Sequence, residues 1–150
     1  MAEIELRSPD FEQDAFIPDR HSHDGGNVSP ALEWFGVWTD AVELLLLCED
    51  PDAPSGTFLH WLVTGIDRGA VGVPESNVPL GGREWPNSFG ETGWGGPAPP
   101  PGHGTHHYVT TLYALARPVE LPDKPTVDDV HRAVEGSTLG QGSLVGLYKR

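Results

Sequence analysis

The chain has 150 residues and a formal net charge of −13, from 9 basic and 22 acidic side chains. This length suits a single domain over residues 1–150, and the acidic balance excludes nucleic acid and anionic membrane surfaces as electrostatic partners, because both are bound through Lys and Arg. Cys48 is the only cysteine, no transmembrane segment or signal-peptide pattern is present, and we expect a cytoplasmic protein.

Strands dominate the predicted elements. Apolar alternation and β-branched runs predict strands at 4–7, 31–34 and 42–49, followed by a central strand at 57–67. Glycines and prolines break residues 68–82 into a loop.

The last third of the chain adds two strands and a helix. Residues 106–116 and 138–149 are predicted to be strands, and a helix is expected over 126–135. Thr126 and Asp129 are spaced as in a capping box, and apolar residues then recur at three- and four-residue intervals. Together these elements indicate a mostly β protein, an antiparallel, Greek-key-like β-sandwich with one or two peripheral helices.

An acidic turn follows the buried strand at 42–49. Its sequence is DPDAP, so Asp50 and Asp52 are held by prolines that restrict the backbone on either side. His60 follows within an otherwise apolar strand. Two fixed carboxylates beside a buried histidine favour a small polar pocket, and the alternative is an acidic surface turn followed by a core histidine. The tight reversal also predicts a cis Ala53–Pro54 bond.

A second cluster lies further along the chain. Residues 93–102 read GWGGPAPPPG and lead to His106, His107 and Tyr108. The two motifs, in this order and spacing, resemble the phosphatidylethanolamine-binding protein family in its bacterial Raf-kinase-inhibitor-like branch. The resemblance runs from about Ser8 to the C-terminus and implies the same β-sandwich. Trp94 departs from the pattern, because the family often has tyrosine there.

The resemblance implies a function and a site. It implies a binding protein for anionic or phospho-amine ligands, such as phosphate or a phospholipid head group, that regulates or inhibits a kinase or protease. It also favours a homodimer, with the loop from Trp34 to Trp38 as a candidate interface. The matching ligand-site positions are Asp50, Asp52, His60, His106 and Tyr108, with Pro99 and Pro100 at the rim.

Strand geometry gives these side chains plausible roles. Side chains alternate along a strand, so His106 and Tyr108 share one face, while His60 shares its face with Phe58 and Leu62. An aspartate that accepts an imidazole N–H fixes the tautomer and favours protonation, so both histidines are expected to protonate near neutral pH. Imidazolium and phenol groups then donate to an anion, and the second carboxylate receives an ammonium group.

Other functions remain open from the sequence. One alternative is that the polar cluster is an internal hydrogen-bond network, and another is a small hydrolase that uses an Asp/His acid–base pair on a phosphoester or ester. We assign no catalytic residue, because no nucleophile motif or P-loop is present. We also assign no metal site and no cofactor: His103, His106 and His107 lack His-x-His spacing, and His21 and His23 are expected to face solvent.

Overall fold

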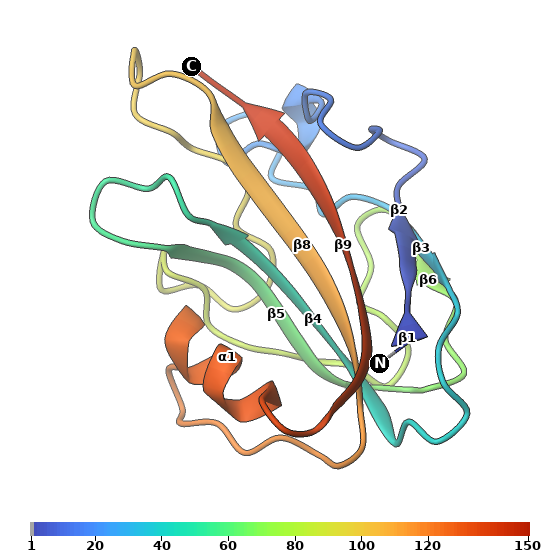
Figure 1. The fold of residues 1–150 in the computed structure, drawn as a ribbon. Coiled ribbons are helices and arrows are strands. Elements are labelled where there is room, and N and C mark those ends of the chain that lie inside the picture. The colour runs from blue at the N-terminus through green and yellow to red at the C-terminus, as the bar shows by residue number, and fades with distance from the viewer. Residues whose placement is uncertain (1) are drawn as a thin grey trace.

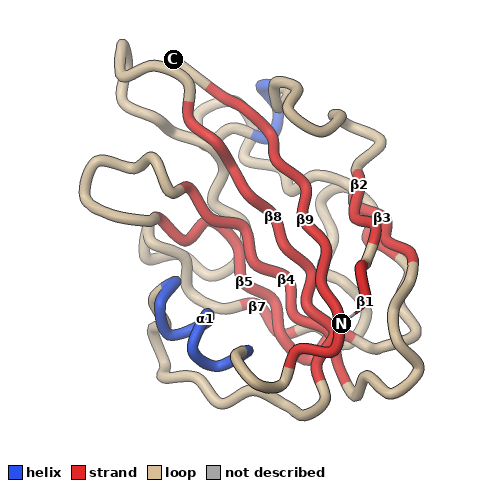
Figure 2. The backbone as a smooth tube through the Cα atoms, viewed as in Figure 1, coloured by secondary structure: helices blue, strands red, loops and turns tan. Residues whose placement is uncertain are grey.

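The computed structural model describes residues 2–150, which form two sheets, one α-helix and one short 3-10 turn (Figures 1 and 2). The strands are β1 Ala2–Glu3, β2 Glu5–Arg7, β3 Leu32–Phe35, β4 Glu43–Asp50, β5 Phe58–Ile66, β6 Gly72–Val73, β7 Arg83–Glu84, β8 His106–Leu115 and β9 Thr138–Tyr148. The 3-10 turn η1 spans Asp19–His21, and helix α1 spans Val127–Val134. Within the described residues, no helix is long and apolar enough to span a membrane.

The large sheet has six strands in the order β1-β9-β8-β4-β5-β7, and the small sheet has the order β2-β3-β6. All strand pairs are antiparallel except β1 with β9. The run β8-β4-β5-β7 has the spatial order of a Greek key, because β8 returns beside the first strand of the set. This arrangement confirms the predicted mostly β fold with a peripheral helix.

Two apolar clusters cover the two faces of the large sheet. Between the sheets, Leu46, Trp61 and Leu112 pack against Trp34 and other residues of the small sheet. On the opposite face, the apolar side of α1 packs against Leu45 and Leu47 of β4 and Leu59 and Leu62 of β5, as the position of the helix in Figure 1 illustrates. Successive side chains of β4 therefore enter opposite clusters, which is why its sequence is apolar at nearly every position.

Helix α1 begins as the sequence predicts. The Thr126 side chain accepts a hydrogen bond from the Asp129 N–H, and the Asp129 carboxylate accepts one from the Thr126 N–H. This reciprocal pair satisfies two backbone donors that a helix start otherwise leaves without partners. Val127, Val130 and Val134 form the buried side of the helix.

The predicted strands coincide with observed ones to within one residue at each end. The prediction that residues 68–82 form a loop throughout is wrong, because β6 lies within them and pairs with β3. Its two residues include Gly72, whose missing side chain lets the Leu32 carbonyl of β3 approach closely. So short a strand leaves no periodic pattern that a sequence could reveal.

Candidate functional site

The DPDAP turn connects β4 to β5 and lies at the same end of the large sheet as the start of β8 (Figure 1). Asp50 closes the turn, because its Oδ1 accepts the Asp52 N–H at 2.8 Å. No peptide bond between residues 2 and 150 is cis, so the cis prediction for Ala53–Pro54 is wrong. The reversal is completed instead by Gly56, which has a φ of 112° that favours glycine.

Asp50 and His106 form a buried pair. Asp50 Oδ2 lies 2.7 Å from His106 Nδ1, and both side chains are almost fully buried. A carboxylate only accepts, so Nδ1 carries the proton. The other ring nitrogen, Nε2, lies 2.6 Å from Nδ1 of His103, in the loop before β8. Asp50 therefore fixes the orientation of the His106 ring, and the second ring nitrogen, Nε2, is in contact with His103.

Asp52 has a different partner. Its Oδ2 accepts the backbone N–H of His107 at 2.8 Å and lies 2.7 Å from His107 Nδ1. These hydrogen bonds outweigh partial burial and lower the pKa of the Asp52 carboxyl. His106 and His107 point to opposite sides of β8, so the two aspartates of the turn each hold one of two consecutive histidines. Asp52 lies outside the pocket described below.

His60 is placed by an irregularity in β5. Cys48 pairs with Trp61 and Glu49 pairs with Leu59, which leaves His60 as an extra residue in a β-bulge. The bulge directs His60 and Phe58 toward the pocket, while Leu62 joins the cluster under α1. The expectation that Leu62 shares this face is therefore wrong, because it assumed uninterrupted alternation.

The surroundings of His60 keep it neutral. Its Nδ1 lies 2.6 Å from the Gly95 carbonyl oxygen and therefore donates. The rings of Phe58, Phe89 and Tyr108 lie 4.6, 5.8 and 5.1 Å from the imidazole, centroid to centroid. Burial lowers the His60 pKa to about 4, against which the Gly95 hydrogen bond acts only partially. The expectation that His60 protonates near neutral pH is wrong, and its Nε2 is an acceptor.

Tyr108 follows His106 by two residues in β8, so both side chains lie on the same face of the strand. Tyr108 packs in the inter-sheet cluster and also lines the pocket described below. Among residues 2–150 the buried Tyr108 hydroxyl has no hydrogen-bond partner. Burial and the nearby charge of Asp50 raise its pKa, so the group is a phenol that can donate a proton in a hydrogen bond.

Hydrogen bonds from Arg150 hold the proline-rich rim of the pocket in place. Arg150 Nε donates to the Pro99 carbonyl oxygen at 2.6 Å, and its guanidinium also pairs with Asp24. On the other side, the Gly96 N–H donates to Asn27 Oδ1 at 2.7 Å. Gly96 lies against the carbonyl of His21, where any side chain would collide. Trp94 lies behind the rim, and its indole N–H donates to the His21 carbonyl.

These groups enclose a pocket with a volume of about 130 Å³. The site residues predicted from the sequence are brought together there, except Asp52. The full lining is Asp50, Ala53, Pro54, Phe58, His60, Phe89, Ala98, Pro99, Pro100, His106 and Tyr108. Sequence reasoning missed Phe89 in the lining, His103 beside His106, and Arg150 beneath the rim. Phe89 belongs to a loop without periodicity, and Arg150 is distant in sequence from its partners, so neither leaves a local signal.

Two further histidines differ from expectation. His21 is fully buried, so its assignment to solvent is wrong; the 3-10 turn η1 carries it inward. His23 is half-buried and stacks on Phe89 at 4.2 Å between ring centroids. The entry segment is therefore packed against the site, although its turn-rich composition indicated an exposed loop.

Known proteins resemble this chain over nearly its whole length. The model of the phosphatidylethanolamine-binding protein family matches residues 7–149. The chain belongs to this family. It is 40% identical over 153 residues to a UPF0098 protein of Methanothermobacter thermautotrophicus, covering 98% of this chain and 99% of that protein. The crystal structure of Escherichia coli YbcL, described as a new member of the mammalian PEBP family, matches with a TM-score of 0.90 at 26% identity, over 99% of each chain.

A relative in Mycobacterium tuberculosis, provisionally named lipoprotein LppC, is 41% identical over 146 residues, which cover 97% of this chain and 72% of that protein. Its name concerns a membrane-attached protein, so the cytoplasmic location expected here stays a prediction. The family match confirms the resemblance inferred from the DPDAP and GPAPPPG motifs, and the likeness to YbcL confirms the fold class. Family membership supports a ligand-binding protein.

Proposed function

We propose that the pocket binds a small anionic or phospho-amine ligand, such as phosphate or a phosphoethanolamine-like head group. The observation that carries this proposal is that Tyr108 lines the pocket and that its buried hydroxyl has no hydrogen-bond partner among the described residues. An unpaired buried hydroxyl costs about 1–3 kcal/mol of stability. A ligand oxygen that accepts a hydrogen bond from this hydroxyl recovers that free energy.

The polar groups of the pocket suit both ends of a phospho-amine. Tyr108 donates, and His106 donates from Nε2 when both of its ring nitrogens carry protons and His103 moves aside, so both favour phosphoryl oxygens. The neutral His60 offers Nε2 as an acceptor, which favours an ammonium group. Donors and acceptors on different walls fit a ligand that carries opposite charges at its two ends.

The size of the pocket limits the ligand. Drug-sized molecules occupy pockets of about 300–1,000 Å³, whereas this one has about 130 Å³. A head group or a free small anion fits such a volume, and lipid chains would have to remain outside. Because the chain carries a formal net charge of −13, local donors rather than the overall field must attract the anion.

Isothermal titration calorimetry with phosphate, phosphoethanolamine and ethanolamine tests this proposal. We expect phosphoethanolamine to bind most tightly and ethanolamine most weakly. His106→Gln should weaken phosphate binding, while His131→Gln, a matched change of an exposed histidine on α1, should leave it unchanged. Failure of all three compounds to bind, or equal effects of the two substitutions, would contradict the proposal.

The hydrogen-bonded Asp50–His106 pair is also the arrangement that acid–base hydrolysis uses, so a small phosphoesterase or esterase is the second candidate. Turnover of p-nitrophenyl phosphate or acetate that disappears in Asp50→Asn but persists in Asp52→Asn would favour it. Asp52 serves as the control because it lies outside the pocket and bonds His107. We favour binding and expect no turnover.

We also propose that the protein regulates a kinase or protease, which would depend on contacts at its surface.

We further propose that the chain forms a homodimer. Trp34 is buried, and the exposed aromatic side chains in the segment expected to form a dimer interface are Phe35 and Trp38, each 46% exposed. We expect light scattering at micromolar concentration to give a dimer mass that Trp38→Ser reduces; a monomer mass in the wild type would contradict dimerisation.

A further inference from the structure

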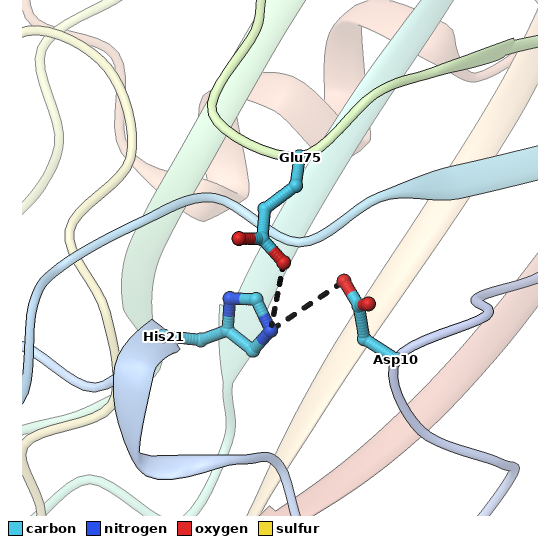
Figure 3. Close-up of side chains that lie close together, drawn as sticks. All are labelled: Asp10, His21 and Glu75. Atoms are coloured by element: carbon cyan, nitrogen blue, oxygen red, sulfur yellow. Dashed lines mark ion pairs between the residues drawn. The ribbon is translucent and has the colours of Figure 1, made fainter.

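Two carboxylate side chains and one imidazole side chain lie close together at a place outside the pocket. Asp10 in the N-terminal segment, His21 in η1 and Glu75 in the loop after β6 point toward one another, as Figure 3 shows. His21 Nε2 lies 3.5 Å from Asp10 Oδ2 and 3.9 Å from Glu75 Oε1. The ligand atoms of all three lie within 4.8 Å of one another. Segments far apart in sequence thus meet at a single point.

The tautomer of His21 leaves one ring nitrogen without a hydrogen-bond partner among the described residues. Its Nδ1 lies 2.7 Å from the Val28 carbonyl oxygen, which only accepts, so Nδ1 carries the proton. In the neutral ring, Nε2 then presents a lone pair. That nitrogen is fully buried and lacks a hydrogen-bond partner in the described part of the chain, yet it faces two carboxylate oxygens. A lone pair held against two anionic groups is unfavourable unless a positive species lies between them.

We propose that Asp10, His21 and Glu75 bind one divalent transition-metal ion, with zinc as its probe. Imidazole nitrogen and carboxylate oxygens are zinc ligands at about 2.0–2.2 Å, and two ligands of a tetrahedral ion are then roughly 3.4 Å apart. The observed separations from His21 Nε2 need only a small contraction toward the ion.

Outer contacts orient the ligands as metal sites require. A ligating histidine usually donates its second N–H to a carbonyl or carboxylate, and His21 donates to Val28. Asp10 Oδ2 accepts the Ala31 N–H, and Asp10 Oδ1 accepts from Arg20. These bonds fix the carboxylate before any ion arrives, so the site is largely preorganised.

Arg20 sets the charge of the site. Its guanidinium bonds both carboxylates at 3.0 Å, which leaves the cluster with one net negative charge when His21 is neutral. Glu75 is the most exposed ligand, at 37%, and its Oε1 is the oxygen shared with Arg20. We therefore expect the ion to enter past Glu75, which exchanges part of its contact with Arg20, and a water from solvent to complete the coordination.

Zinc titration of tag-free, chelator-treated protein tests the site, by calorimetry and by thermal unfolding. We expect one equivalent to bind and the unfolding temperature to rise with zinc concentration, because the ion binds only the folded chain. Glu75→Gln keeps an acceptor for Arg20 and should weaken zinc binding at least about tenfold, since even outer-shell changes cost that much. Asp10→Asn is the second variant and should act in the same direction.

The competing location for zinc is the His103–His106 pair at the pocket. His103→Ala should leave zinc binding unchanged. The proposal is overturned if the wild type binds no zinc at high micromolar concentration. It is equally overturned if binding persists in both Glu75→Gln and Asp10→Asn, or is lost in His103→Ala.

Discussion

Asp50 holds His106 through a 2.7 Å contact between two almost fully buried groups on adjacent strands β4 and β8. Residues fifty-six positions apart in sequence thereby act as one unit. The pair directs the remaining nitrogen of His106 toward the loop that carries His103. Any ligand that takes a hydrogen bond from His106 must displace this neighbour.

His103→Ala should strengthen phosphate binding roughly fivefold, because the ligand no longer breaks the 2.6 Å contact between His103 and His106, worth about 1 kcal/mol. Calorimetry compares this variant with the wild type. A matched exposed substitution, His131→Ala, should have no effect. Weaker binding in His103→Ala would show instead that His103 itself contacts the ligand.

His60 should make the fold sensitive to acid. Its pKa is about 4 in the folded chain and about 6.5 when unfolded, so the unfolded chain takes up the proton first as pH falls. The wild type should therefore keep full stability above about pH 6.5 and lose about 3 kcal/mol by about pH 4 relative to His60→Gln. Urea unfolding of both proteins across this range measures the difference. Parallel pH profiles would contradict the burial-driven shift.

The sequence predicts the strands and helix well because their signals are local. Apolar alternation identifies β4, β5, β8 and β9, and the Thr126 capping box identifies the start of α1. The two motifs also identify most of the pocket lining, since each lies at the end of a predictable strand.

The failures share a physical cause. The β-bulge at His60, the inward turn of His21 and the contact of Arg150 with the rim depend on pairing between distant segments. Such pairing leaves no periodicity in the chain around those residues. The trans geometry at Ala53–Pro54 likewise depends on how Gly56 completes the turn.

Tyr108→Phe tests most directly whether the hydroxyl of Tyr108, which has no hydrogen-bond partner among residues 2–150, binds a ligand. Phosphate and phosphoethanolamine titrations are combined with urea unfolding in the absence of ligand. Thr126→Ala, which removes the helix cap, is the control: it should cost about 1 kcal/mol of stability and leave affinity unchanged.

For Tyr108→Phe we predict the opposite pattern. Loss of the buried, unpaired hydroxyl should raise stability by up to about 1–3 kcal/mol, while affinity for both ligands falls roughly fivefold to tenfold. A variant that binds both ligands as tightly as the wild type would contradict the proposed site.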